Sequence, residues 1–340
     1  MIATAQTVAG TEQFASVGLE TLGVRYGLAS NNPHLILNPE FYGPGEIQSL
    51  VTAIGEFRFV PYGPDMDAYM TVVDVPGRAA EVITSGKHLY CLGDWGRLDR
   101  EKHDRRLTLM GNIGLFYRYS LAVMEHCGVY SLHASCIYRP DRNELLIIVG
   151  GPGAGKTVYL LEGIQRDYQI FSTEMTFFKF TSQGVVFYRG SLLDNIRLGN
   201  FVYDYPQAAE KLGLALPKTD NPWTTKISVH MDQITTKGPE LLNPRLTFIF
   251  PRIESGREVA VVTDIKRPEG LVKGLFDNAS EKIGGSFLLY DNVPVAGFDT
   301  PEVLQRRLQA MRKLVEASQW EIVQAKSVLA GSKNCMEGIE

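Results

Sequence analysis

A run of glycines directly after an apolar stretch is the feature that most constrains the fold of this 340-residue chain. Residues 145–149 read Leu-Leu-Ile-Ile-Val, and residues 150–157 read Gly-Gly-Pro-Gly-Ala-Gly-Lys-Thr. A buried strand, a glycine-rich turn and a helix that begins at Lys156 are the setting of a phosphate-binding loop. The glycines let the backbone curl so that successive N–H groups point at phosphate oxygens. The helix adds the unpaired N–H groups and the positive dipole end of its first turn.

The residues of this loop are expected to hold a nucleotide and its metal ion. Lys156 is long enough to reach the β- and γ-phosphates, and the Thr157 hydroxyl is a suitable ligand for Mg²⁺. The alternative is a chance glycine turn, which the correct order of strand, loop, Lys-Thr pair and helix argues against. We predict nucleotide contacts from these residues: Gly151, Pro152, Gly153, Ala154, Gly155, Lys156, Thr157 and Val158.

Composition excludes several other classes of protein. Hydrophobic residues make up 44% of the chain and charged residues 21%, which is typical of globular domains with a proper core. The net charge of −4 gives no indication of a nucleic-acid surface, and the longest apolar runs are too short to span a membrane. The first residues do not resemble a secretory signal, and the four cysteines have no CxxC spacing. We therefore expect a cytoplasmic protein with reduced thiols.

The patterning of the chain divides it into four parts. Residues 1–105 predict a small strand-rich N-terminal domain of α+β type, and residues 106–127 have the apolar spacing of a connecting helix. Residues 128–300 form the expected nucleotide domain. Residues 301–340 begin with an amphipathic helix that we expect to pack on this chain, with a partner subunit as the alternative. Expected strands of the first part lie at 34–37, 56–60, 69–75, 80–83 and 88–92.

A histidine is expected beside the glycine-rich loop. Strands at 129–138 and 144–149 flank a strong turn signal, Arg-Pro-Asp-Arg-Asn at 139–143. Antiparallel pairing keeps the sum of paired residue numbers constant, which places His133 opposite Gly150 within a residue or two. A histidine there lies within reach of a bound γ-phosphate, and a satisfied core histidine is an equal alternative. Further strands are expected at 168–171, 175–180, 185–188, 246–250 and 259–262, with a short helix at 206–212.

A carboxylate is expected on the same side of the sheet. Glu174 ends the segment Ile-Phe-Ser-Thr-Glu, one helical crossover after the loop. A right-handed crossover returns this strand beside 145–149, with its carboxyl end on the side of the loop. Glu174 can then hold Mg²⁺ or accept a proton from a hydroxyl that attacks the γ-phosphate. An ordinary surface glutamate is the alternative.

Three further residues are weaker candidates. Asp264 ends an apolar run, but a threonine precedes the acid, so we rank it below Glu174 for metal binding. Arg252 and Arg257 lie in one turn between expected strands, where they can grip a transferred phosphate or stay solvated.

Together these segments resemble a known arrangement. His133-Ala-Ser, the glycine-rich loop and Phe171-Ser-Thr-Glu174 are similar to the catalytic domain of HPr kinase/phosphorylase. The resemblance covers about residues 128–265, and Tyr188-Arg-Gly190 and 255–261 are similar to later stretches of that family more loosely. It implies an α/β fold with a P-loop and a mixed sheet, of the phosphoenolpyruvate-carboxykinase-like nucleotide type. It also implies an ATP and Mg²⁺ site, transfer to a hydroxyl, and a role for Arg257.

The chain also departs from that family. Thr173-Glu174 stands where the family has two adjacent acids, and no Asp lies near Gly151-Pro152 of the loop. The residues before 128 do not look like the regulatory domain of the family. The resemblance therefore implies a divergent relative with another substrate.

These observations predict an ATP- and Mg²⁺-dependent kinase. Its acceptor is a hydroxyl of a small molecule or of a serine in a peptide or protein, with neither nucleic acid nor membrane as partner. A homo-oligomer is compatible with the resemblance. A nucleotide-binding sensor without transfer and a P-loop ATPase are the alternatives. The expected catalytic residues are Glu174, His133, Lys156 and Arg257, and the expected metal ligands are Thr157 and Glu174.

Overall fold

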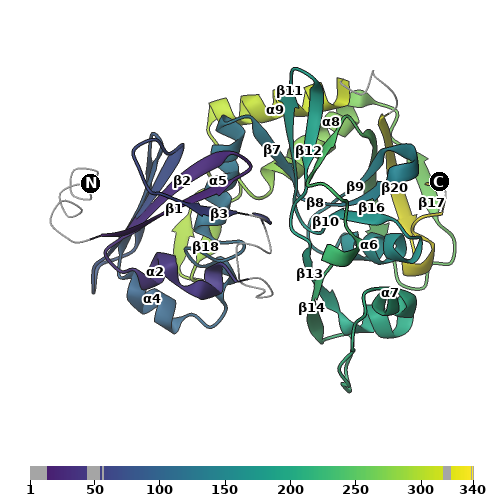
Figure 1. Cartoon of the computed structure of the whole chain (residues 1–340), viewed down its shortest axis with the longest axis horizontal. Helices are drawn as coiled ribbons and strands as arrows, with labels where there is room; N and C mark the ends of the chain where they lie inside the picture. Colours follow the sequence, from purple (N-terminus) through teal and green to yellow (C-terminus); the bar gives the residue numbers. More distant parts are fainter. Residues whose placement is uncertain (1–13, 44–53, 56, 317–322, 338, 340) are drawn as a thin grey trace. The chain divides into compact units, whose positions relative to one another are not determined.

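The computed structural model describes residues 14–43, 54–55, 57–316, 323–337 and 339, and the chain forms two compact units (Figure 1). The first unit consists of residues 1–128 and 282–300, and the second of residues 129–281 and 301–340. The fold is mixed α/β in both. None of the helices in these described ranges is long and apolar enough to cross a membrane.

The boundary of the units differs from the expected domains at one segment. Residues 282–300, expected in the nucleotide domain, belong to the first unit. There the Tyr290 hydroxyl lies 3.2 Å from Oδ1 of Asp99, and the Tyr290 N–H donates to the carbonyl of Leu107. These contacts join positions nearly two hundred residues apart, which local patterning does not report.

The first unit contains a six-stranded mixed sheet in the order β3-β1-β2-β4-β6-β5. Helix α5 (Leu115–His126) lies against β2, where the Tyr26 hydroxyl donates to the carbonyl of Ser120 and the Tyr26 ring meets Phe116 edge-on. The strands are β1 (Ala15–Thr21), β2 (Val24–Ser30), β3 (Arg58–Val60), β4 (Ala68–Asp74), β5 (Glu81–Ser85) and β6 (His88–Gly93). The short helices α2 (His34–Leu37) and α4 (Trp95–Glu101) and the strands β18 (Phe287–Leu289) and β19 (Val293–Val295) complete this unit.

Two expectations for this unit are wrong. Residues 34–37 form helix α2 rather than a strand, because Pro33 at its N-cap already has helical backbone angles. The helix expected from 106 onward begins only at Leu115. Before it the backbone folds back tightly: an added Cβ at Gly111 or Gly114 would lie 2.0 Å from a carbonyl oxygen. Only glycine fits in this tight turn, so the backbone before Leu115 is not helical although the apolar residues there have helical spacing.

The second unit contains a six-stranded mixed sheet in the order β10-β8-β9-β16-β20-β17. Its strands are β10 (Gln169–Ser172), β8 (Ala134–Arg139), β9 (Glu144–Val149), β16 (Arg245–Ile253), β20 (Val323–Ala330) and β17 (Val261–Asp264). The turn at 139–143 is confirmed: β8 and β9 pair antiparallel, with Arg139 opposite Glu144 and Ala134 opposite Val149. β9, β16 and β20 run parallel, so their carboxyl ends share one edge of the sheet.

The expected strand at 129–138 is two strands that belong to different sheets. β7 (Val129–Leu132) pairs with β11 (Thr176–Thr181), whereas β8 pairs with β9 and β10. β11 and β12 (Gly184–Tyr188), which match the strands expected at 175–180 and 185–188, form a hairpin in a four-stranded sheet with β15 (Glu240–Leu242) and β7. A separate antiparallel pair, β13 (Leu193–Arg197) and β14 (Lys226–His230), follows. His133 therefore lies where the chain passes from one sheet to the next.

The position of β10 corrects another expectation. β10 pairs with β8 and does not lie beside β9, because β8, the other strand of the hairpin, occupies that edge of β9. β10 is antiparallel to β8 and hence runs in the same direction as β9. Its carboxyl end, and with it Glu174, still lies at the edge of the sheet where the glycine-rich loop begins.

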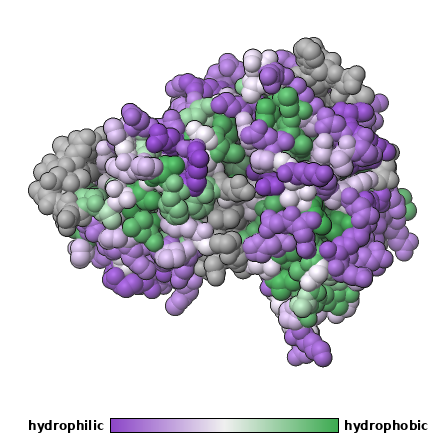
Figure 2. All heavy atoms as spheres, viewed as in Figure 1, coloured by the Kyte–Doolittle hydropathy of each residue, from purple (hydrophilic) through white to green (hydrophobic). Residues whose placement is uncertain are grey.

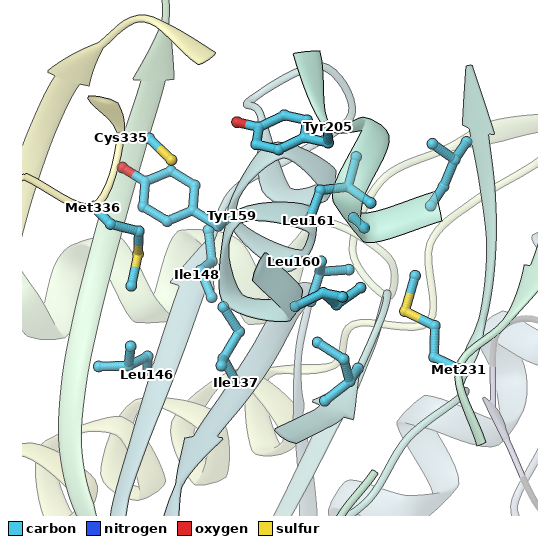
Figure 3. Close-up of a cluster of buried hydrophobic side chains, with 14 of the residues drawn as sticks. Ile137, Leu146, Ile148, Tyr159, Leu160, Leu161, Tyr205, Met231, Cys335 and Met336 are labelled. Carbon is cyan, nitrogen blue, oxygen red and sulfur yellow. The ribbon is translucent and has the colours of Figure 1, made fainter. Parts of the chain in front are cut away.

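Strand β9 is buried on both faces, which explains its uninterrupted apolar run. On one face Leu146 and Ile148 pack with Ile137 against Tyr159 and Leu160 of α6 (Lys156–Gln165), as Figure 3 shows. On the other face alternate residues of β9 pack against α8 (Pro268–Ser280) and α9 (Pro301–Glu316). The expected core packing of the C-terminal helix is therefore confirmed. Helix α7 (Pro206–Lys211) matches the short helix expected there.

The surface in view in Figure 2 is mostly hydrophilic, and hydrophobic side chains gather in limited areas of each unit. Exposed aromatic residues include Phe59 of the first unit and Trp223 of the second.

Candidate functional site

The glycine-rich loop joins the end of β9 at Val149 to the start of α6 at Lys156. Gly153 and Gly155 have φ angles of 82° and 102°, a region that side chains other than glycine rarely adopt. An added Cβ on Gly150 would lie 2.5 Å from the Cβ of Ala154. The loop conformation therefore requires these glycines, and Gly155 has no side chain to cap the first N–H groups of α6.

Gly155 offers a direct stability prediction. Its added Cβ would lie 2.3 Å from Cγ1 of Ile253, at the end of β16, whereas Gly153 has nothing within 4 Å. We expect Gly155→Ala to lower the free energy of unfolding by about 3 kcal/mol, from backbone strain and overpacking together. Gly153→Ala is the matched control and should cost only about 1 kcal/mol, the strain alone. Urea denaturation measures both, and equal losses would show that the contact with Ile253 does not restrict the loop.

Lys156 is held by three groups at the base of the loop. Its Nζ lies 2.7 Å from the Gly150 carbonyl oxygen, 3.3 Å from that of Gly151 and 3.0 Å from Nε2 of His133. The ammonium group thus sits under the loop, next to the N-terminal end of α6. This is the position from which a lysine can contact phosphate oxygens bound by the loop.

His133 lies opposite Gly150, as the pairing argument predicts: the Gly150 N–H donates to the His133 carbonyl at 3.4 Å. Its side chain is buried, yet it contacts charged groups on both sides. Nδ1 lies 2.9 Å from Oε2 of Glu281, and Nε2 faces Lys156. The tautomer with its proton on Nδ1 satisfies both contacts, because Nδ1–H then donates to Glu281 while Nε2 accepts from the ammonium group.

Glu174 reaches the same histidine. Its Oε1 lies 3.5 Å from Nε2 of His133, and its side chain is partly exposed. The neighbouring residue Thr173 is buried, and its hydroxyl lies 2.9 Å from the carbonyl oxygens of Ser191 and Leu193, which share its one proton. Glu174 thus extends from a fixed backbone toward the group around Lys156, which is the side of the sheet expected from the crossover.

Asp194 is a carboxylate that the sequence analysis missed. The Thr157 hydroxyl donates to Oδ2 of Asp194 at 3.1 Å, and the Asn195 N–H donates to its Oδ1 at 2.7 Å. Burial and, second, the charge of Glu174 raise the pKa of the Asp194 carboxyl to about 6. The only signal in the sequence is an acid after Leu192-Leu193, which is too short a run to indicate a strand that ends at a site.

Glu281 is the second residue that the sequence analysis missed. It follows the last residue of α8, and its contact with His133 spans 148 positions. Such a pairing depends on how α8 packs on the sheet, so no local pattern indicates it.

Asp194 makes the stability of the protein depend on pH. Because its pKa is 3.8 before folding and about 6 after, the folded state binds more protons between these values, and the free energy of unfolding falls as pH rises through them. Above pH 6 the ionised carboxylate costs about 3 kcal/mol in the metal-free protein. We expect Asp194→Asn to remove this cost, so that its stability advantage over wild type grows from pH 4 to pH 8. Urea unfolding in EDTA at pH 4, 6 and 8 measures it; a constant difference would contradict the assignment.

The remaining candidates are not joined to this group. The Arg257 guanidinium pairs with Glu254 at 2.9 Å within its own turn, and its carbonyl accepts from Asn334. Among the described contacts, none links Arg257 to Lys156. Asp264 is exposed at the end of β17, the edge strand that β16 and β20 separate from β9, so it lies three strands away from the loop.

Metal-binding clusters built from protein side chains alone are absent from the part of the chain that the structure describes. No group of three or more His, Cys, Asp or Glu side chains there is arranged to hold a metal ion. Comparison with known proteins leaves the chain without a family, since no family model and no curated protein matches it. Any function must therefore be argued from the site itself.

Proposed function

We propose that the second unit binds ATP with Mg²⁺ and transfers the γ-phosphate to a hydroxyl group, on a fold of the HPr kinase type. The observation that carries the proposal is the contact of Lys156 and Glu174 with the same ring nitrogen of His133. A phosphate-binding cation and a carboxylate that can accept a proton are thereby held together at the mouth of a glycine-rich loop. Phosphoryl transfer needs these two groups in this proximity.

The loop and Lys156 supply the positive groups. The uncapped N–H groups at the start of α6 can bind phosphate oxygens, and Lys156 can exchange its contacts with Gly150 and Gly151 for β- and γ-phosphate oxygens. These groups stabilise the charge on the transferring phosphoryl, which supplies most of the rate enhancement in such reactions.

Glu174 is the proposed base. The acceptor hydroxyl gives its proton to the Glu174 carboxylate while its oxygen forms a bond to the γ-phosphorus, and the bond to the β-phosphate oxygen breaks to release ADP. His133 positions the Lys156 ammonium through Nε2 and is itself oriented by Glu281, and Oε1 of Glu174 lies 3.5 Å from the same Nε2.

The donors around Thr157 fit Mg²⁺. A hydroxyl and carboxylate oxygens are the hard ligands that this ion prefers, and it commonly takes only one or two ligands from the protein and the others from phosphates and water. When bound, the ion would neutralise charge on the β- and γ-phosphates.

A direct assay tests the proposal. The protein is incubated with γ-labelled ATP or GTP and a panel of small alcohols and serine-containing peptides, and both ADP release and labelled product are followed. Label on an acceptor supports the kinase. ADP release without labelled acceptor indicates an ATPase, and binding without turnover indicates a sensor. The cytoplasmic location and the homo-oligomer stay predictions.

A further inference from the structure

We propose that Asp194, together with Thr157, holds the magnesium ion of this site, and that Glu174 is thereby left free of the metal to act on the acceptor hydroxyl. The inference rests on the proposed function and revises one part of it, since the sequence alone assigns the metal to Thr157 and Glu174. It names a ligand from β13, a strand outside the main sheet.

The contact between Asp194 and Thr157 is the first observation. The hydroxyl of Thr157 donates to Oδ2 of Asp194 at 3.1 Å, while Oδ1 is fixed by the Asn195 N–H at 2.7 Å. The Thr157 hydroxyl oxygen and Oδ2 of Asp194 thus face each other at the start of α6, and the Asn195 N–H fixes the carboxylate that carries Oδ2. A cation that takes the place between them, with the hydroxyl proton turned away, would meet two of the hard oxygen ligands that Mg²⁺ prefers.

The second observation is that the segments carrying the two carboxylates are joined to each other. The Thr173 N–H donates to the Ser191 carbonyl at 2.9 Å, and the Thr173 hydroxyl lies 2.9 Å from the carbonyl oxygens of both Ser191 and Leu193, between which its one proton is shared. These contacts fix residues 191–193 against the residue before Glu174. This attachment brings a strand of the two-stranded sheet to the loop edge of the main sheet, and with it Asp194.

The third observation is that the two carboxylates contact different groups. Asp194 contacts Thr157, whereas Glu174 contacts His133, which also contacts Lys156. Thr157 is the residue of the loop suited to the metal, and Lys156 is the one suited to the terminal phosphates. The carboxylate beside Thr157 is therefore the metal ligand, and the one beside the Lys156 group lies where the γ-phosphate meets its acceptor.

Charge supports this division of roles. Two carboxylates close to each other repel, and a divalent cation between Asp194 and Thr157 relieves that repulsion without using Glu174. Thr173 stands where the family that the sequence resembles has an acid. Its hydroxyl contacts the carbonyl oxygens of Ser191 and Leu193 instead and so holds the β13 segment.

The test measures metal binding rather than activity. Mn²⁺ affinity is determined by electron paramagnetic resonance in the presence of a non-hydrolysable ATP analogue, for wild type, Asp194→Asn and Glu174→Gln. We expect Asp194→Asn to weaken Mn²⁺ binding by at least about tenfold, a loss seen even for residues that only support metal ligands. Glu174→Gln should stay within about threefold of wild type. Asp232→Asn, in the exposed turn after β14, is the matched control and should change nothing.

A second pair of variants guards against a folding defect at Asp194. Thr157→Ser keeps the hydroxyl and should keep Mn²⁺ affinity, whereas Thr157→Val removes it and should lose affinity as Asp194→Asn does. Affinity for the analogue in EDTA is measured in parallel, and Asp194→Asn should bind it at least as tightly as wild type because a negative charge is lost near the phosphates.

The outcomes separate this inference from the proposed function. Weakened Mn²⁺ binding in Glu174→Gln together with unchanged binding in Asp194→Asn overturns the assignment of the metal, and leaves a nucleotide site. Wild type that binds neither the analogue nor Mn²⁺ with it overturns the proposed function itself. Equal losses in both variants overturn the separation of roles, because both carboxylates would then hold the ion.

Discussion

Lys156→Met is expected to lower ATP turnover by about 10³-fold or more, the largest effect that this structure predicts for a single substitution. The ammonium group is the cation at the base of the loop, and without it the charge on the transferring phosphoryl loses its nearest positive partner. Methionine retains the length and the apolar stem of the side chain, so that the packing below the loop is kept. Steady-state ADP release with saturating ATP measures the loss.

The interpretation of that result depends on two controls. Lys273→Met removes an exposed lysine of α8 and should leave turnover unchanged. The midpoint of thermal unfolding of Lys156→Met should lie close to that of wild type. This result would show that the loss of turnover comes from the chemistry and not from unfolding. Turnover in Lys156→Met that equals wild type would contradict the assignment of the phosphate site.

Glu174→Gln is expected to lower kcat by about 10²- to 10⁴-fold while ATP affinity stays within about threefold. A base acts mainly in the transition state, so its loss reduces kcat far more than nucleotide binding. Glutamine keeps the size and shape of the side chain but cannot accept the proton. Equilibrium binding of ATP and initial rates with the acceptor separate the two quantities.

The matched control for this variant is Glu210→Gln on α7, an exposed glutamate that should leave both quantities unchanged. Equal losses of rate and affinity in Glu174→Gln would indicate a metal-holding or structural role. That result would also contradict the assignment of the metal to Asp194, so the two experiments check each other.

Short-range features of the second unit were predictable from the sequence. The turn signal at 139–143 and the apolar run of β9 predict the β8–β9 hairpin and its register, and with them the place of His133 opposite Gly150. Once the turn is known, it fixes which residues of the two strands face each other, because paired residue numbers in an antiparallel pair sum to a constant. In the loop, Gly153 and Gly155 have positive φ angles, as a tight glycine-rich turn requires.

Long-range pairings were not predictable in the same way. β10 lies beside β8 rather than β9. Its place depends on which edge of the β8–β9 hairpin remains unpaired, and this cannot be inferred from the residues of β10. The strand at 129–138 divides between two sheets at His133, although its residues read as one apolar stretch. β1 and β2 of the first unit were missed because glycine and polar residues interrupt their apolar positions.

The sequence by itself determined the loop, its helix and the histidine opposite, because turn chemistry, glycine spacing and strand register act over a few residues. Only the tertiary structure decided which carboxylates join them. Asp194 reaches Thr157 through hydrogen bonds between β13 and the segment before Glu174, and Glu281 reaches His133 from the end of α8. Such contacts arise from the packing of distant elements, whose positions depend on the whole core rather than on local sequence.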